Sequence, residues 1–224
     1  SLRTMIQNGW FYQGNKKCFR DNDGHVVTKI LNEDVCAVIG PHTSGNAAAT
    51  SELYKNAQIP FLTGGSSPKL AEMDNPYFFR IRPSDTINGQ VAAKYAVETL
   101  EAKKIGISYN NNDFGTGGRD VVIEALEEAG IDYVAVGHNA GDKDLTGQIM
   151  QLMSENVDCI ISWTDDAEVV LTARQLYELG MDVPVIASAG IVMDQVLNGR
   201  LLDDVVEGTL YFPFTDIGSL RQLF

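Results

Sequence analysis

Hydroxyl groups gather in a short loop near the start of the chain, where a predicted helix begins. The loop starts at Gly40 and carries His42, Thr43 and Ser44. The first N–H groups of a helix have no partner within the helix, and the helix dipole adds positive charge there. Residues 40–46 are therefore suited to binding a carboxylate. Simple capping of the helix by Thr43 or Ser44 accounts for the same residues.

A second loop of the same character follows the next predicted strand. It contains Gly64, Gly65, Ser66 and Ser67, and its glycines allow the backbone to approach a ligand closely. Capping accounts for each loop separately. One shared anion site accounts for both loops being small, polar and at the same edge of a sheet, so we predict a single carboxylate site.

Two loops of the second half combine polar and aromatic residues. One holds three asparagines before Phe114, and the other holds Trp163 followed by Asp165 and Asp166. Helix capping is the ordinary role of such Asn and Asp residues. Alternatively, an Asp carboxylate pairs with a ligand ammonium group while Phe114 or Trp163 covers an apolar part of the ligand.

Catalytic motifs are weak in this sequence. Ser66 to Lys69 matches the S-x-x-K pattern, but neither of its partner motifs is present. Residues 115–120 place Asp120 where a dinucleotide fingerprint requires a glycine. The histidines are scattered, although His42 could line the binding cleft, and the cysteines show no C-x-x-C spacing. We expect no catalysis, no cofactor and no metal.

The charge balance makes nucleic acid an improbable partner. Thirty acidic residues against 17 basic ones give a net charge of -13, which repels a phosphate backbone. No run of about 18 apolar residues exists, and the first four residues lack a signal-peptide layout. We expect a soluble, already processed chain. The three cysteines fit either a Cys18–Cys36 disulfide or three buried thiols, Cys159 included.

Short apolar runs alternate with helix-length segments along most of the chain. The predicted strands are Cys36–Ile39, Pro60–Thr63, Lys104–Tyr109, Tyr133–Val136, Asp158–Trp163, Val183–Ala187 and Gly208–Phe212. The predicted helices are Ser44–Asn56, Ser84–Leu100, Gly115–Ala129, Leu145–Glu155, Asp166–Leu179 and Val192–Leu201. This alternation predicts an α/β fold with doubly wound parallel sheets.

The proline-bounded segment Tyr77–Pro83 breaks the alternation and is interpreted as a strand connecting two lobes. A second crossing is expected near Gly208–Pro213. The first lobe then comprises residues 1–83 together with 214–224, and the second comprises 84–213. No flexible linker separates them, so we expect a hinge.

The order and spacing of several blocks resemble the leucine/isoleucine/valine-binding family of type I periplasmic binding proteins, the receptors of ABC importers. The blocks are Ala37–Pro41 with Ser44-Gly45, Ile59-Pro60-Phe61 with Pro68-Lys69-Leu70, Phe79-Arg80 with Pro83-Ser84-Asp85, Ala93–Val97, Asp113-Phe114-Gly115 with Gly117, Leu179-Gly180, and Val206-Glu207-Gly208. They extend from about Asp34 to Gly208.

The resemblance implies that the hydroxyls of Ser44 and Ser66 hold the carboxylate of an amino acid while the Gly64 carbonyl faces its ammonium group. Ser67 is the alternative to Ser66 by a slip of one residue. In the second lobe, Phe114 stands where the family often has a ligand-facing tyrosine. Asp165 or Asp166 falls near another contact position.

The sequence also departs from this family. Ala189 stands where branched-chain receptors have a glutamate for the ammonium group. Either an Asp carboxylate replaces that glutamate, or the ligand has no ammonium group. The chain is shorter than the family norm, so we expect an incomplete first lobe.

The resemblance implies an extracytoplasmic solute-binding protein that delivers an amino acid or related carboxylate to the membrane permease of an ABC importer. A signal peptide and a lipid anchor in the full-length protein belong to this expectation. The alternatives are the ligand-sensing domain of a receptor, a protein that binds amides, urea or aromatic acids, and an enzyme on a Rossmann-like scaffold. The enzyme would need a cofactor site that the sequence does not provide.

Overall fold

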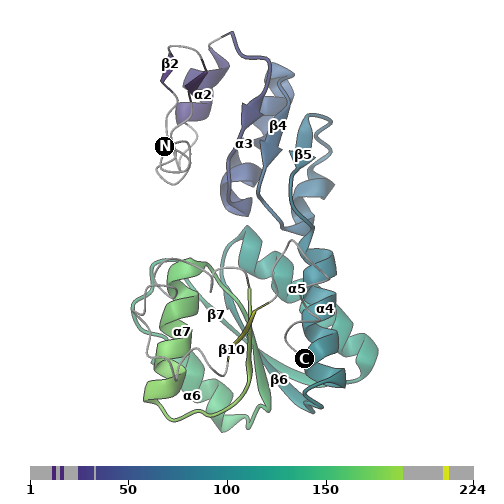
Figure 1. Cartoon of the computed structure of the whole chain (residues 1–224), viewed down its shortest axis with the longest axis vertical. Coiled ribbons are helices and arrows are strands. Elements are labelled where there is room, and N and C mark those ends of the chain that lie inside the picture. Colours follow the sequence, from purple (N-terminus) through teal and green to yellow (C-terminus); the bar gives the residue numbers. More distant parts are fainter. Residues whose placement is uncertain (1–11, 14–15, 18–24, 33, 189–208, 212–224) are drawn as a thin grey trace. The chain divides into compact units, whose positions relative to one another are not determined.

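The computed structural model describes residues 12–13, 16–17, 25–32, 34–188 and 209–211. The chain divides into two compact units, Ser1–Arg82 and Pro83–Phe224 (Figure 1). The expected helix Val192–Leu201, residue Ala189 and the segment 214–224 lie outside the described residues.

The first unit is built on a three-stranded parallel sheet. The strands are β3 (Val38–Ile39), β4 (Phe61–Thr63) and β5 (Phe78–Arg80), in the order β3-β4-β5. The other elements are α2 (His25–Leu31), α3 (Ser44–Ala57), the 3₁₀ helix η1 (Pro68–Met73) and an antiparallel pair of short strands, β1 (Tyr12–Gln13) and β2 (Lys16–Lys17). Tyr54 of α3 stacks on Phe61 of β4 at the centre of the core, with their ring centroids 4.4 Å apart.

Strand β5 lies within segment 77–83, which was predicted as a strand connecting two lobes. Phe78 pairs in register with Phe61 and packs edge-on against its ring, so β5 completes the sheet of the first unit. The predicted strand therefore belongs to the sheet of the first unit, and the chain divides after it.

The second unit is built on a five-stranded parallel sheet. Its strands are β6 (Lys104–Asn110), β7 (Asp132–His138), β8 (Cys159–Trp163), β9 (Val185–Ala187) and β10 (Thr209–Tyr211), in the order β10-β9-β8-β6-β7. Four helices connect them: α4 (Asp85–Glu98), α5 (Asp113–Ala129), α6 (Thr146–Ser154) and α7 (Asp166–Glu178). Figure 1 shows α4 and α5 on one side of this sheet and α6 and α7 on the other.

Strand alternation explains why helices cover both faces of the second sheet. Successive side chains of a strand point to opposite faces. Ile161 packs in one cluster with residues of α4 and α5, whereas the preceding Ile160 packs in the other cluster with residues of α6 and α7. Both faces bury apolar surface, which confirms the predicted doubly wound α/β architecture.

The thiols are not all buried. Cys159 lies in the core of the second unit, but Cys36 is exposed, so the expectation of three buried thiols is wrong for Cys36. Cys18 lies outside the described residues.

None of the helices in the described part of the chain combines the length and the hydropathy needed to cross a membrane.

Candidate ligand-binding site

Ser44 connects the two hydroxyl-bearing loops of the first unit. The cap of α3 is Thr43, whose side chain accepts a hydrogen bond from Asn46 N at 3.4 Å. Ser44 is only 2% exposed, and its Oγ accepts hydrogen bonds from the backbone N–H groups of Ser66 and Ser67, both at 3.2 Å. Capping therefore explains Thr43, whereas Ser44 fixes the second loop against the start of α3.

These bonds determine how the Ser44 hydroxyl can interact with anything else. A serine hydroxyl has two acceptor lone pairs and one donor hydrogen. Two N–H groups already occupy the acceptor side, so the O–H hydrogen is left to donate. The neighbouring Ser67 Oγ is buried and has no hydrogen-bond partner among the described residues. Both hydroxyls are thus available as donors to an oxygen ligand such as a carboxylate.

The side chain of Arg80 binds carbonyl groups of the same loop. The sequence did not predict this role. Its Nε donates to the Gly65 carbonyl at 3.2 Å, and its Nη2 donates to the Ser67 carbonyl at 2.7 Å. Thr63 Oγ1 accepts from Gly65 N at 3.0 Å and donates to the Pro41 carbonyl. The loop is held at several points, and the guanidinium adds positive charge next to it, which favours an anion.

The two glycines of this loop lie close to neighbouring side chains. A Cβ at Gly64 would lie 2.5 Å from His42 Nδ1, and a Cβ at Gly65 would lie 2.7 Å from Leu70 Cδ1. His42 is exposed, with its imidazole against Gly64. Any larger residue at position 64 would displace this imidazole.

In the second unit, polar residues gather where β6, β7 and β8 end. Asn110 ends β6 and pairs in register with His138, which ends β7. Asp165 follows β8 and occupies the capping position of α7, yet its side chain forms no capping hydrogen bond. Its Oδ2 instead accepts from Asn112 Nδ2 at 2.6 Å, while its backbone N–H donates to Asn110 Oδ1 at 2.6 Å. Helix capping therefore does not explain Asp165.

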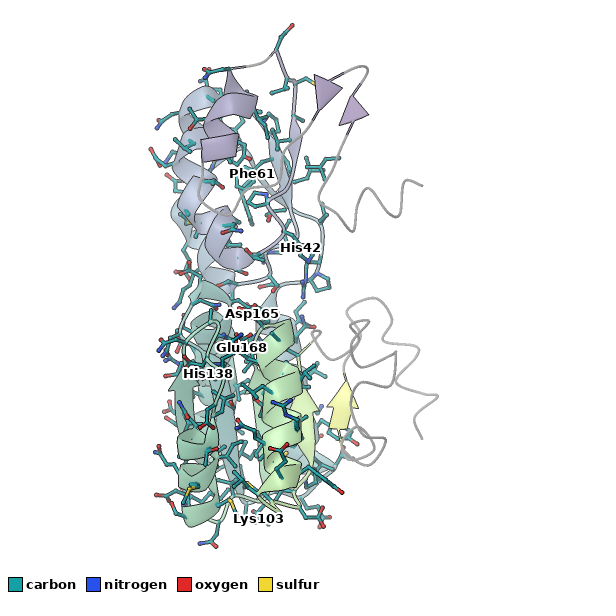
Figure 2. All side chains as sticks on the ribbon, turned by 90° about the vertical axis from the view of Figure 1, so that its left-hand side faces the viewer. His42, Phe61, Lys103, His138, Asp165 and Glu168 are labelled. Carbon is teal, nitrogen blue, oxygen red and sulfur yellow. The ribbon has the colours of Figure 1, made fainter. Side chains whose placement is uncertain are left out.

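His138 and Glu168 lie buried beside Asp165, as Figure 2 shows. Glu168 Oε1 accepts a hydrogen bond from Gly141 N at 2.6 Å, which ties α7 to the loop after β7. Neither ring nitrogen of His138 has a hydrogen bond of good geometry among the described residues. Burial lowers the pKa of His138, opposed by the Asn139 backbone and by the carboxylates of Glu168, Asp142 and Asp165.

The neutral state of His138 predicts a loss of stability in acid. Its pKa is lowered from 6.5 by folding, so the unfolded chain binds its proton more readily. The stabilisation is complete above pH 6.5 and is lost as the pH falls from there toward the pKa of the folded state. Urea unfolding between pH 8 and 5 should show a fall in the free energy of unfolding that is smaller in His138→Gln. Equal falls in both proteins would contradict this assignment.

The two aromatic candidates differ in accessibility. Trp163 is 3% exposed and packs against α5, because Gly118 leaves room for its indole. Phe114 is half-buried, with its ring centroid 6.3 Å from that of Trp163. Of the two, Phe114 has the surface that a ligand could touch. The side chain of Asp166 is not among those that the structure describes.

The predicted site residues thus form two groups, one in each unit. Thr43, Ser44, Gly64, Gly65, Ser66 and Ser67 come together after β3 and β4 in the first unit, with His42 beside them. In the second unit, Phe114 follows β6, Trp163 ends β8 and Asp165 follows β8. Sequence reasoning missed Arg80, His138 and Glu168, and it included Asn110 in the asparagine-rich loop without assigning it a contact. A signal for Asn110 existed, because Ser108 and Asn110 lie two positions apart on one face of β6, after its apolar middle Ile105–Ile107.

The parallel sheets and the polar strand ends are typical of a binding protein with α/β lobes. The sequence profile of the periplasmic binding protein family matches residues 22–218 of the chain. The chain therefore belongs to the periplasmic binding protein family. This membership confirms the resemblance to the periplasmic binding proteins that the sequence blocks indicated.

Among curated proteins, the leucine-specific-binding protein of Salmonella typhimurium is 30% identical over 137 residues, which is 60% of this chain and 37% of that protein. A leucine-, isoleucine-, valine-, threonine- and alanine-binding protein of Pseudomonas aeruginosa is 27% identical over 188 residues, which is 83% of this chain and 50% of that protein. The chain thus spans half or less of the length of these two relatives.

Solved structures share the fold. A leucine-binding protein of Thermotoga maritima superposes with a TM-score of 0.79 at 23% identity, covering 84% of this chain and 54% of that one. A solute-binding protein of an ABC transporter from R. palustris, in complex with 4-hydroxybenzoate, superposes with a TM-score of 0.72 at 18% identity, covering 79% and 50%. At these identities the likeness establishes the architecture alone.

Proposed function

We propose that this chain forms the ligand-binding part of an extracytoplasmic protein that captures a small carboxylate, an amino acid or a related acid, for an ABC importer. The proposed contacts are the hydroxyls of Ser44 and Ser66 or Ser67 in the first unit, and Asp165 with Phe114 in the second. Binding to groups of two lobes favours a closed state over an open one, and the permease would recognise the closed form.

One observation carries the choice of a carboxylate. The Ser44 hydroxyl accepts hydrogen bonds from two backbone N–H groups, which leaves its own hydrogen free to donate. The Arg80 guanidinium, which donates to two carbonyls of the same loop, adds positive charge there. A donor hydroxyl beside a fixed cation favours an anionic oxygen over a neutral one.

The relatives indicate which acids deserve testing. Branched-chain amino acids are named for the Salmonella and Pseudomonas proteins, and 4-hydroxybenzoate is bound in the R. palustris structure. Both ligands carry a carboxylate, and only the amino acids carry an ammonium group. An aromatic acid is the second candidate, favoured by the accessible ring of Phe114.

A thermal-shift panel tests this proposal. The protein, expressed with the full sequence of its gene, is heated with aliphatic amino acids, aromatic carboxylates, amides, urea and sugars. A ligand at 100 times its Kd stabilises the folded state by about 2.7 kcal/mol, which corresponds to a rise in Tm of about 5 to 10 °C at this chain length. We expect such a rise with at least one carboxylate.

The same panel defines failure. A rise with amides, urea or sugars and with none of the carboxylates would refute the carboxylate site. No rise with any compound would count against ligand capture itself. Ser66→Ala and Ser67→Ala, compared with the best acid, decide which of the two hydroxyls contacts the ligand.

A further inference from the structure

Asn112 holds the carboxylate of Asp165 in a fixed orientation. Its Nδ2 donates to Asp165 Oδ2 at 2.6 Å, and its Oδ1 caps α5 by accepting from Gly115 N at 2.8 Å. An amide that accepts with its oxygen on one side must present its NH₂ group on the other. The capping bond therefore fixes which end of Asn112 faces Asp165.

Asn110 holds the main chain of the same residue. Its side chain is fully buried, and its Oδ1 accepts from the Asp165 backbone N–H at 2.6 Å. Side chain and main chain of one aspartate are thus bound by two asparagines that lie two positions apart. Asp165 cannot turn its carboxylate to cap α7 without breaking the bond to Asn112.

Negative charge at this point is not neutralised within the described part of the unit. No Lys or Arg described there forms an ion pair with Asp165 or Glu168. No described donor reaches Oδ1 of Asp165, which is half-buried. His138 does not supply a full positive charge, because burial lowers its pKa. A partly buried carboxylate without a cation favours a ligand that carries one.

Unpartnered polar atoms lie next to this carboxylate. Asn110 Nδ2 is buried and has no hydrogen-bond partner among the described residues, and neither buried ring nitrogen of His138 has a hydrogen bond of good geometry there. Native proteins leave few such atoms, and each requires an explanation. Their position at the ends of β6 and β7 coincides with the edge of the sheet where parallel α/β folds bind ligands.

We propose that Asn110 and Asn112 are positioning residues that orient the Asp165 carboxylate and leave its second oxygen for the ammonium group of a ligand. This inference rests on the proposed function, and it selects amino acids over acids that lack an amino group. The contact with the ammonium group is assigned to Asp165, and Asn110 and Asn112 act on the ligand only through Asp165.

The contacts of Asn110 and Asn112 with Asp165 form a clamp on this residue. The substitution Asn112→Ser tests the clamp. Serine retains a capping oxygen for Gly115 N but is too short to reach Asp165. The probes are leucine and 4-methylpentanoate, which has the same carbon skeleton without the amino group. We expect the Kd for leucine to rise about tenfold, the effect of one hydrogen bond to a charged group, and the Kd for 4-methylpentanoate to change less than about twofold.

A second readout needs no ligand. Burial raises the pKa of Asp165, and the Asn112 hydrogen bond opposes that rise. In Asn112→Ser the carboxyl carbon of Asp165, followed by NMR during a pH titration, should therefore shift its midpoint to higher pH. A merely structural substitution would leave this midpoint in place.

Controls separate the clamp from general damage. Ser84→Ala removes the cap of α4 in the same unit, where Ser84 Oγ accepts from Thr86 N, and should leave the ratio of the two Kd values unchanged. Asp165→Asn keeps the shape but loses the charge, so it should abolish the preference for leucine. If Asn112→Ser does not fold, Asp165→Asn still decides whether the charge selects leucine.

The outcomes are distinct for the two proposals. An unshifted Asp165 midpoint in Asn112→Ser, or an unchanged ratio of the two Kd values, would overturn the positioning role. Binding of neither probe to the unaltered protein would count against the amino acid ligand of the proposed function. In that case the NMR titration alone decides the clamp.

Discussion

Replacing Ser44 with alanine is expected to weaken carboxylate binding about 5- to 150-fold, corresponding to about 1 to 3 kcal/mol for a hydrogen bond to a charged group. The same change leaves the buried N–H groups of Ser66 and Ser67 without their acceptor. We therefore also expect the free energy of unfolding to fall by about 1 to 3 kcal/mol. Calorimetric titration and urea unfolding measure the two effects.

Thr50→Val is the matched control for Ser44→Ala. Thr50 is also buried in α3, but its hydroxyl donates to Asn46 O within the same helix. Its loss should leave carboxylate affinity unchanged. Equal affinity in Ser44→Ala and the unaltered protein would remove Ser44 from the site, and equal loss in both variants would show that the effect is not specific to the loop contact.

Gly115→Ala is expected to destabilise the second unit by about 1 to 3 kcal/mol or more, as overpacked sites do. A Cβ at this position would overlap the backbone N, C and O atoms of Asn110. Backbone at the end of a central strand cannot move aside as a flexible side chain can. The substitution would push the start of α5 away from β6, so the Asn112 cap and the Asn110 contact to Asp165 should weaken as well.

Gly147→Ala provides the comparison in the first turn of α6. No atom lies within 4 Å of a Cβ built there. Since alanine favours a helix over glycine by about 1 kcal/mol, this variant should be neutral or stabilised. Urea unfolding of the two variants under the same conditions measures the contrast. A Gly115→Ala protein as stable as Gly147→Ala would show that the two elements do not approach as closely as described.

The architecture could be predicted because its signals are local. Short β-branched runs such as Cys159–Trp163 are buried on both faces, and helical periodicity separates them, so alternation alone indicates parallel sheets. Segment 77–83 was harder. Strand β5 has the same apolar residues whether it connects two lobes or pairs with β4, and only its register with Phe61 distinguishes the two.

The sequence indicates candidate residues where a residue type suggests its own role, and it gives no signal where the role depends on a distant partner. The hydroxyls of Ser44 and Ser66 stand out in small, polar loops after strands. Arg80 does not, because its role depends on carbonyl oxygens 13 and 15 residues earlier in the chain. The pairing of Asn112 with Asp165 spans 53 residues and follows from the contact between β6 and β8.

Mass spectrometry of small molecules released when the purified full-length protein is denatured tests the central claim most directly. A ligand that accepts a hydrogen bond from the Ser44 hydroxyl near Arg80 should be a carboxylic acid. It should be recovered at close to one molecule per protein. Recovery of one equivalent of a ligand without any carboxyl group would contradict the account.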